Sequence, residues 1–127
     1  MVEGNIFLFP GSGDDHMWTI ISDPSADPNH VVVVKFHSFN DYPEQEKACV
    51  IYAGEHRYLT HATYVDYACA YLTTDSHLES LKKSGRLKMR NRDLGSGLLA
   101  KIRAAVPDSR IPLESEKVLE AQGLLPR

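Results

Sequence analysis

Five short apolar runs occupy the first 72 residues of this chain, and they limit its fold more than any other feature. They are rich in Val, Ile, Phe and Tyr, which favour strands, and the Gly, Pro, Asp and Asn between them favour turns. The runs cover residues 5–9, 17–22, 30–36, 48–53 and 65–72. Five strands at this spacing predict a small barrel or a rolled sheet, and the proline-rich connector at 23–29 predicts a hairpin.

The hydrophobic period changes from strand-like to helix-like at Thr74, which begins a cluster of residues that favour helix N-caps. The expected helices run through Leu78 and Leu81 to Gly85, from a Ser96 cap to Pro107, and over 112–122. A length of 127 residues with 43% apolar content suits one domain with its own core. We therefore predict a single α+β domain, mainly β, with a β-barrel core at 1–72 and a helical C-terminal part at 73–127.

Charge is divided unevenly along the chain, although the net charge is only −3. Residues 1–79 carry three basic and twelve acidic residues, a net charge of −9, whereas residues 80–127 carry eleven and five, a net charge of +6. Between residues 82 and 103 there are eight basic residues and one acid, Asp93. That density attracts a phosphate backbone, and it is equally typical of a solvated helical face that balances acidic groups of the same chain or of a partner subunit.

The apolar runs are far shorter than a membrane span, and the first residues lack the basic flank and long apolar stretch of a signal peptide. These features predict a cytoplasmic protein that does not enter a membrane. Only Cys49 and Cys69 are present, and their positions in strand-like segments favour buried core thiols over a disulfide or half of a metal site.

The glycine-rich segment at 11–15 lacks the lysine of a phosphate-binding loop. Its two acids, Asp14 and Asp15, suit a solvated turn or a metal site. A zinc site made of His56 and His61 with His16 or Asp15 is an alternative, but this spacing is not that of a known zinc motif. We expect no cofactor and no resident metal.

The segment GSGDDHMWTIISDP, followed after a proline loop by HVVVVKFHS, resembles the MazF/PemK/Kid group of toxin ribonucleases. The resemblance covers residues 4–72 and lies in the order of segments and in the residues that end the strands. It implies a compact SH3-like barrel, usually a homodimer, that cleaves single-stranded RNA without a metal. It also implies an antitoxin protein that holds this activity in check.

Two positions carry the family's site onto this chain. His16 stands where the family has its catalytic arginine, and it is followed by Met17 in place of proline. Ser38 stands where a family strand ends in threonine or serine. Because the family's arginine stabilises the phosphate in the transition state, its replacement leaves an alternative open. In that alternative the barrel is inactive and binds a protein or a nucleic acid.

The stretch GEHRYLTHATY at 54–64 offers a replacement for the arginine. RNA cleavage by the 2′-hydroxyl needs a base, an acid and a group that stabilises phosphate charge, and imidazoles serve both proton steps near neutral pH. We predict His16, Ser38 and His61 as catalytic residues. The residues predicted to contact RNA by stacking, hydrogen bonding or charge are Trp18, His56, Arg57, Tyr58, Tyr64, Lys88, Arg90 and Arg92.

Overall fold

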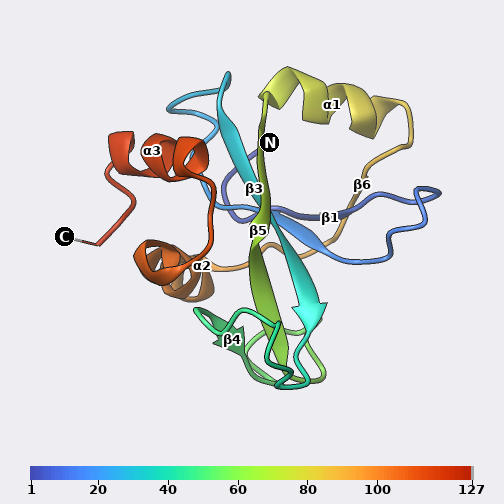
Figure 1. The fold of residues 1–127 in the computed structure, drawn as a ribbon. Coiled ribbons are helices and arrows are strands. Elements are labelled where there is room, and N and C mark those ends of the chain that lie inside the picture. Colours follow the sequence, from blue (N-terminus) through green and yellow to red (C-terminus); the bar gives the residue numbers. More distant parts are fainter. Residues whose placement is uncertain (127) are drawn as a thin grey trace.

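The computed structural model describes residues 1–126, which form a six-stranded antiparallel sheet and three α-helices (Figure 1). The strands are β1 (Ile6–Leu8), β2 (Trp18–Ile20), β3 (Val31–Ser38), β4 (Val50–Ile51), β5 (Thr63–Thr73) and β6 (Lys88–Met89). The helices are α1 (Asp75–Lys83), α2 (Ser96–Ala104) and α3 (Leu113–Ala121), with a 3-10 turn at Val106–Asp108. The strand order is β4-β5-β3-β2-β1-β6, so the two longest strands, β3 and β5, are adjacent.

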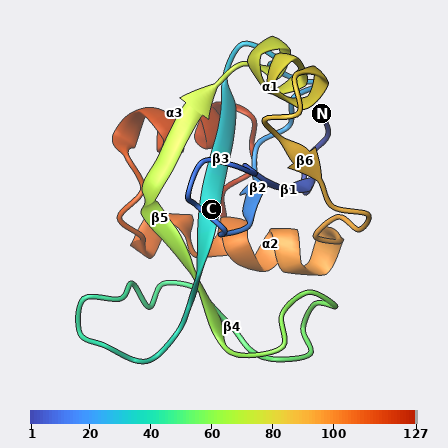
Figure 2. The same cartoon turned by 90° about the vertical axis from the view of Figure 1, so that its right-hand side faces the viewer.

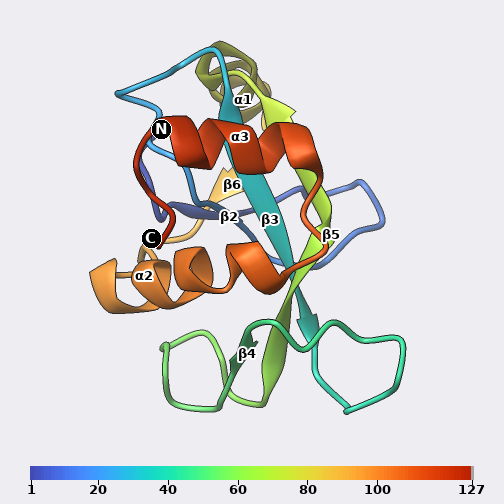
Figure 3. The same ribbon diagram turned by 60° about the vertical axis from the view of Figure 1, so that its left-hand side comes forward.

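One face of the sheet packs against α2 and α3, which lie across it in Figure 3. Strand residues alternate between faces, so Val32, Val34 and Phe36 of β3 point into this layer. From the helices, Leu99, Ile102 and Leu119 close it.

Within residues 1–126, the other face of the sheet is covered by a helix only at one end. There Val31 and Val33 pack with Phe7, Trp18 and Leu78, the last of which comes from α1. Figure 2 shows α1 at one end of β3 and β5 and the loops around β4 at the other. Past Val33, the same side of β3 carries Lys35 and His37. The VVVV run is therefore buried on both faces, whereas the following KFHS is buried on one.

The prediction of a mainly β, α+β domain is confirmed. Within residues 1–126, β4 and β6 form the two edges of the sheet and do not pair with each other, so the sheet is open rather than closed into a barrel. The hairpin at 23–29 is confirmed, since β2 and β3 pair antiparallel around it. The basic, two-residue strand β6 was not expected, because it is too short to show a period and is held by pairing with β1.

The predicted N-cap of one helix is confirmed, and that of another is wrong. Thr74 caps α1, and its hydroxyl accepts a hydrogen bond from the backbone N–H of His77. Ser96 is the first residue of α2, and Gly95, with φ of +82°, takes the cap position without a side-chain bond. Among residues 1–126, no helix combines the length and the apolar character needed to cross a membrane.

Candidate functional site

Polar side chains gather on the part of the sheet face that α1 leaves uncovered. On β3 and β5 the pairs Lys35–Asp66 and His37–Tyr64 lie directly opposite each other. His16 precedes β2 and reaches the same side, because β2 pairs with β3. We call this surface the histidine face; it consists of Asp14, His16, Lys35, His37, Tyr64, Asp66 and Cys69.

Asp14 fixes the orientation of His16. One carboxylate oxygen lies 2.8 Å from His16 Nδ1 and also accepts the backbone N–H of His16 at 2.9 Å. The other oxygen lies 2.9 Å from the ammonium of Lys35. Burial alone raises the pKa of Asp14, but the bonds from Lys35 and His16 outweigh it and hold this pKa well below the usual range. The carboxylate therefore stays charged and holds Nδ1 of His16, so that Nε2 is the ring nitrogen outside this contact.

Asp14→Asn is expected to lower the free energy of unfolding by about 1–2 kcal/mol at pH 7, because it removes charge-assisted hydrogen bonds. The pKa of Asp14 is lower in the folded chain than in the unfolded chain. This stabilisation is therefore complete at pH values above the unfolded pKa of about 3.9, and it is lost as the pH falls towards the folded pKa. Urea unfolding at pH 7 and pH 2.5 should show the deficit of the variant shrinking at the lower pH. The matched change Asp15→Asn, on a fully exposed carboxylate, should leave stability unchanged at both. An equal deficit for Asp14→Asn at both pH values would contradict the role of its charge.

His37 lies between two rings. Its ring centroid is 4.3 Å from that of His16 and 5.3 Å from that of Tyr64, with which it stacks. Its Nε2 is 3.1 Å from a carboxylate oxygen of Asp66, yet the angles do not make a hydrogen bond, and this buried nitrogen has no hydrogen-bond partner among residues 1–126. Burial lowers the pKa of His37, and the neighbouring charges of His16 and Lys35 lower it further against the opposing effect of Asp66. The imidazole is therefore neutral at pH 7.

A second polar pair lies where β3 ends and β5 begins, near β4. The Oγ atom of Ser38 is 2.8 Å from Nε2 of His61, although the two residues are 23 positions apart in the sequence. Thr63 supports the loop by donating its hydroxyl to the carbonyl oxygen of His61 at 3.2 Å. Both side chains of this Ser38–His61 dyad are exposed. Because neighbouring residues of a strand point to opposite faces, Ser38 lies on the other side of β3 from His37.

The three residues predicted to be catalytic are thus divided between two places. Ser38 and His61 form the dyad, whereas His16 packs against His37 on the histidine face.

No family model matches the chain, and neither does any curated protein or solved structure. The function of the site is therefore inferred from the contacts of its own side chains.

Several residues predicted to contact RNA meet in a groove beside β6. The guanidinium of Arg90 lies 4.0 Å above the ring centroid of Tyr58, whose hydroxyl accepts the backbone N–H of Arg92 at 3.0 Å. Nε2 of His56 lies 2.7 Å from the carbonyl oxygen of Asp93. We call this the basic groove; it is a pocket of about 280 Å³ lined by Leu8, Tyr58, Lys88, Met89, Arg90 and Asn91.

Other predicted positions are corrected or lie apart. Trp18 is only 8% exposed, with Lys35 over its ring and T-shaped contacts to Phe9 and Tyr71, so little of the ring is open to a base; the RNA contact there stays a prediction. Cys49 is buried as predicted, but Cys69 is exposed, and both thiols are free. Arg57 is exposed on the loop before His61.

The sequence analysis missed four members of the histidine face, namely Lys35, His37, Asp66 and Cys69. A signal existed for three of them: KFH in β3 and YVD in β5 alternate polar and apolar residues, which places the polar ones on one face. Cys69 gave no such signal, because a sheet irregularity positions it.

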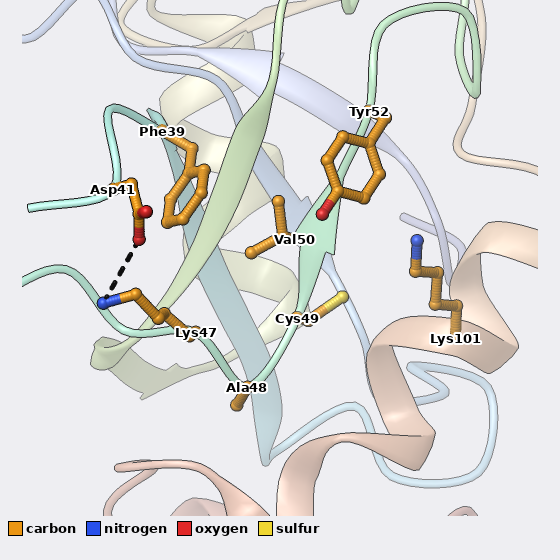
Figure 4. Close-up of a pocket in the computed structure, with 8 residues that line it drawn as sticks. All are labelled: Phe39, Asp41, Lys47, Ala48, Cys49, Val50, Tyr52 and Lys101. Carbon is orange, nitrogen blue, oxygen red and sulfur yellow. Dashed lines mark ion pairs between the residues drawn. The ribbon is translucent and has the colours of Figure 1, made fainter.

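A pocket of about 530 Å³ lies along the edge strand β4 (Figure 4). Its two lysines are engaged: Lys47 lies 3.6 Å from Asp41, and Lys101 lies 3.0 Å from Glu55. Burial raises the pKa of the Cys49 thiol on its wall. The pocket thus offers neither an unpaired lysine nor a reactive thiol.

Proposed function

We propose that this chain is a single-stranded RNA endoribonuclease of the MazF/PemK-like toxin type, which cleaves by attack of the 2′-hydroxyl and uses no metal ion in that step. The observation that carries the proposal is the 2.8 Å contact between Ser38 Oγ and His61 Nε2. A hydroxyl beside an imidazole brings a proton acceptor and a phosphate-binding donor to one point. Both groups are exposed, so a polymer can reach them.

In the proposed reaction, His61 Nε2 takes the proton of the 2′-hydroxyl, which displaces Ser38 as the partner of that nitrogen. The 2′-oxygen forms a bond to phosphorus, and the bond from phosphorus to the 5′-oxygen breaks. The leaving 5′-oxygen takes a proton from solvent. Ser38 donates its hydroxyl to a phosphate oxygen, where negative charge develops in the transition state. The products are a 2′,3′-cyclic phosphate and a 5′-hydroxyl.

Charge favours the dyad over the histidine face as the place of reaction. The histidine face and its margin carry the three acids Asp14, Asp15 and Asp66 and, among their lysines and arginines, Lys35 alone, and this balance disfavours a phosphate. Arg57 is exposed on the same loop as His61, and we assign to it the phosphate contact that the family's arginine makes. The basic groove binds RNA farther along the strand, through Lys88 and the Arg90–Tyr58 stack.

The same proposal relates the open sheet to the SH3-like barrel of the family. The consecutive antiparallel pairing of β1, β2 and β3 supports that relation. From the resemblance, the proposal also includes a homodimer, an antitoxin protein and a place in the cytoplasm.

One observation favours a second candidate, an inactive domain that binds protein or nucleic acid. His16 replaces the family's arginine, and its Nδ1 is already engaged by the carboxylate of Asp14. In that candidate the basic groove still binds nucleic acid, but the dyad performs no chemistry.

The deciding experiment incubates the purified, folded protein, free of copurified protein, with a long single-stranded RNA in EDTA. We expect fragments that end in a 2′,3′-cyclic phosphate, because the proposed step needs no metal. A filter-binding measurement with the same RNA runs in parallel. Intact RNA that is nevertheless bound would overturn the ribonuclease and favour the second candidate. Intact, unbound RNA would overturn the ribonuclease and the nucleic-acid-binding form of the second candidate, and would leave only the form that binds protein.

A further inference from the structure

Three metal-ligating atoms of different chemistry converge on the histidine face. Nε2 of His37 and Sγ of Cys69 each lie 3.1 Å from the same carboxylate oxygen, Oδ2 of Asp66. All three donor atoms lie within 4.8 Å of one another. The set contains one imidazole nitrogen, one thiol sulfur and one carboxylate oxygen, which are the three ligand types that zinc takes in proteins.

An irregularity in the sheet brings these atoms together. Between the pairs Lys35–Asp66 and Val33–Tyr71, β3 advances by two residues and β5 by five. The extra residues of β5 break the strict alternation of its side chains, so that Cys69 turns back to Asp66. The backbone N–H of Cys69 donates to the other oxygen of Asp66, Oδ1, at 3.3 Å. That bond leaves Oδ2 directed at the two other donors.

The surroundings of His37 give an independent indication of a ligand. Its Nε2 is buried and has no hydrogen-bond partner in the described part of the chain, although buried polar atoms are nearly always paired. The imidazole ring is held by His16 on one side and by the stacked Tyr64 on the other. A nitrogen that is oriented, buried and unpaired is ready to bind a cation at the position that Asp66 faces.

We propose that His37, Asp66 and Cys69 bind one zinc ion, with water in the fourth position. Tetrahedral zinc with ordinary bond lengths separates a nitrogen and an oxygen ligand by about 3.4 Å, and a sulfur and an oxygen ligand by about 3.6 Å. The observed separations of 3.1 Å therefore need to open by only about 0.3 to 0.5 Å. The exposure of Cys69 leaves an entry path for the ion and room for the water. This site departs from the sequence expectation of no resident metal.

A second group on the same face, Asp14 with Asp15 and His16, is less suited to a metal. Both oxygens of Asp14 are already used, one by His16 and the other by the ammonium of Lys35 at 2.9 Å. That ammonium already supplies a positive charge to the Asp14 carboxylate. We therefore assign the ion to the β3–β5 site and use the other group as a control.

The zinc site does not rest on the proposed ribonuclease. None of its ligands belongs to the Ser38–His61 dyad, and His37 points to the opposite face of β3 from Ser38. The ion joins β3 to β5 next to the irregularity, so its binding stabilises the folded chain whatever reaction the dyad performs.

Metal binding by the full chain tests the proposal. The reduced, metal-free protein is titrated with Co²⁺ and then with competing Zn²⁺, while the thiolate-to-cobalt absorption band is recorded. The affinity for Zn²⁺ is measured separately by calorimetry. We expect one ion per chain, a thiolate band, and a higher Tm in Zn²⁺. Cys69→Ser should abolish the band, and both Cys69→Ser and Asp66→Asn should weaken Zn²⁺ binding by about tenfold or more. Circular dichroism checks that each variant is folded.

Asp15→Asn is the matched control, because it changes a carboxylate of the neighbouring group without touching the three ligands. It should leave the thiolate band and the Zn²⁺ affinity unchanged. Folded wild-type protein that binds no Zn²⁺ would overturn the proposal. So would Zn²⁺ binding that survives Cys69→Ser and Asp66→Asn but is lost in Asp15→Asn, since the ion would then belong to the other group.

Discussion

His61→Ala is expected to lower the rate of RNA cleavage by about 10²- to 10⁴-fold, because it removes the group that takes the proton of the 2′-hydroxyl. The side chain is exposed, and its polar contacts are with the exposed residues Ser38 and Thr60, so the variant should remain folded. Single-turnover cleavage of a labelled single-stranded RNA in EDTA measures the loss. Binding of the same RNA should change little, since the basic groove is unaltered.

Three further variants separate the dyad from the other histidines. His77→Ala changes an exposed imidazole on α1 and should leave cleavage unchanged. Ser38→Ala should lower the rate by about tenfold or more, because it removes one donor to the phosphate. His16→Ala should have little effect, since this residue packs on the opposite side of β3. If His16→Ala were as damaging as His61→Ala, the dyad would not be the complete site.

The parts of this fold that sequence analysis found are those with local signals. The apolar run at 30–36, the proline connector and Thr74 each act over a few residues, and the structure contains the strand, hairpin and helix cap that they indicate. The barrel was inferred from strand number and spacing, and these do not determine whether the two edge strands meet. In residues 1–126 they do not, because β6 lies on β1 and β4 on β5.

The arrangement of the candidate site's side chains depends more on the register between paired strands than on local signals. Trp18 pairs with Lys35, so two residues further along, His16 meets His37 and brings Asp14 to Lys35. No spacing within one segment shows this contact. The position of Cys69 was harder still to predict. The irregularity that turns it towards Asp66 contains no turn-forming Gly, Pro, Asn or Asp in residues 67–70.

Phe7→Ala is expected to lower the free energy of unfolding by about 3–5 kcal/mol, the usual loss for a fully buried aromatic ring. Phe7 is completely buried in the layer where α1 covers the sheet, beside Trp18, Val33 and Leu78. This layer is small, with seven buried residues, so little material can move into the cavity that the substitution leaves. Urea unfolding followed by circular dichroism measures the effect.

Phe9→Ala is the matched control, because Phe9 is the same residue type two positions along the chain, with its ring centroid 5.4 Å from that of Phe7. Phe9 is only partly buried at the margin of the layer, so we expect a loss of about 1 kcal/mol. Equal losses for the two variants would mean that the α1 layer is not organised around Phe7. Because this layer lies at the α1 end of β3 and the dyad at the β4 end, cleavage per folded molecule should be the same in both variants and in the wild type. A loss of cleavage that follows the loss of stability would instead mean that the two ends of the sheet are coupled.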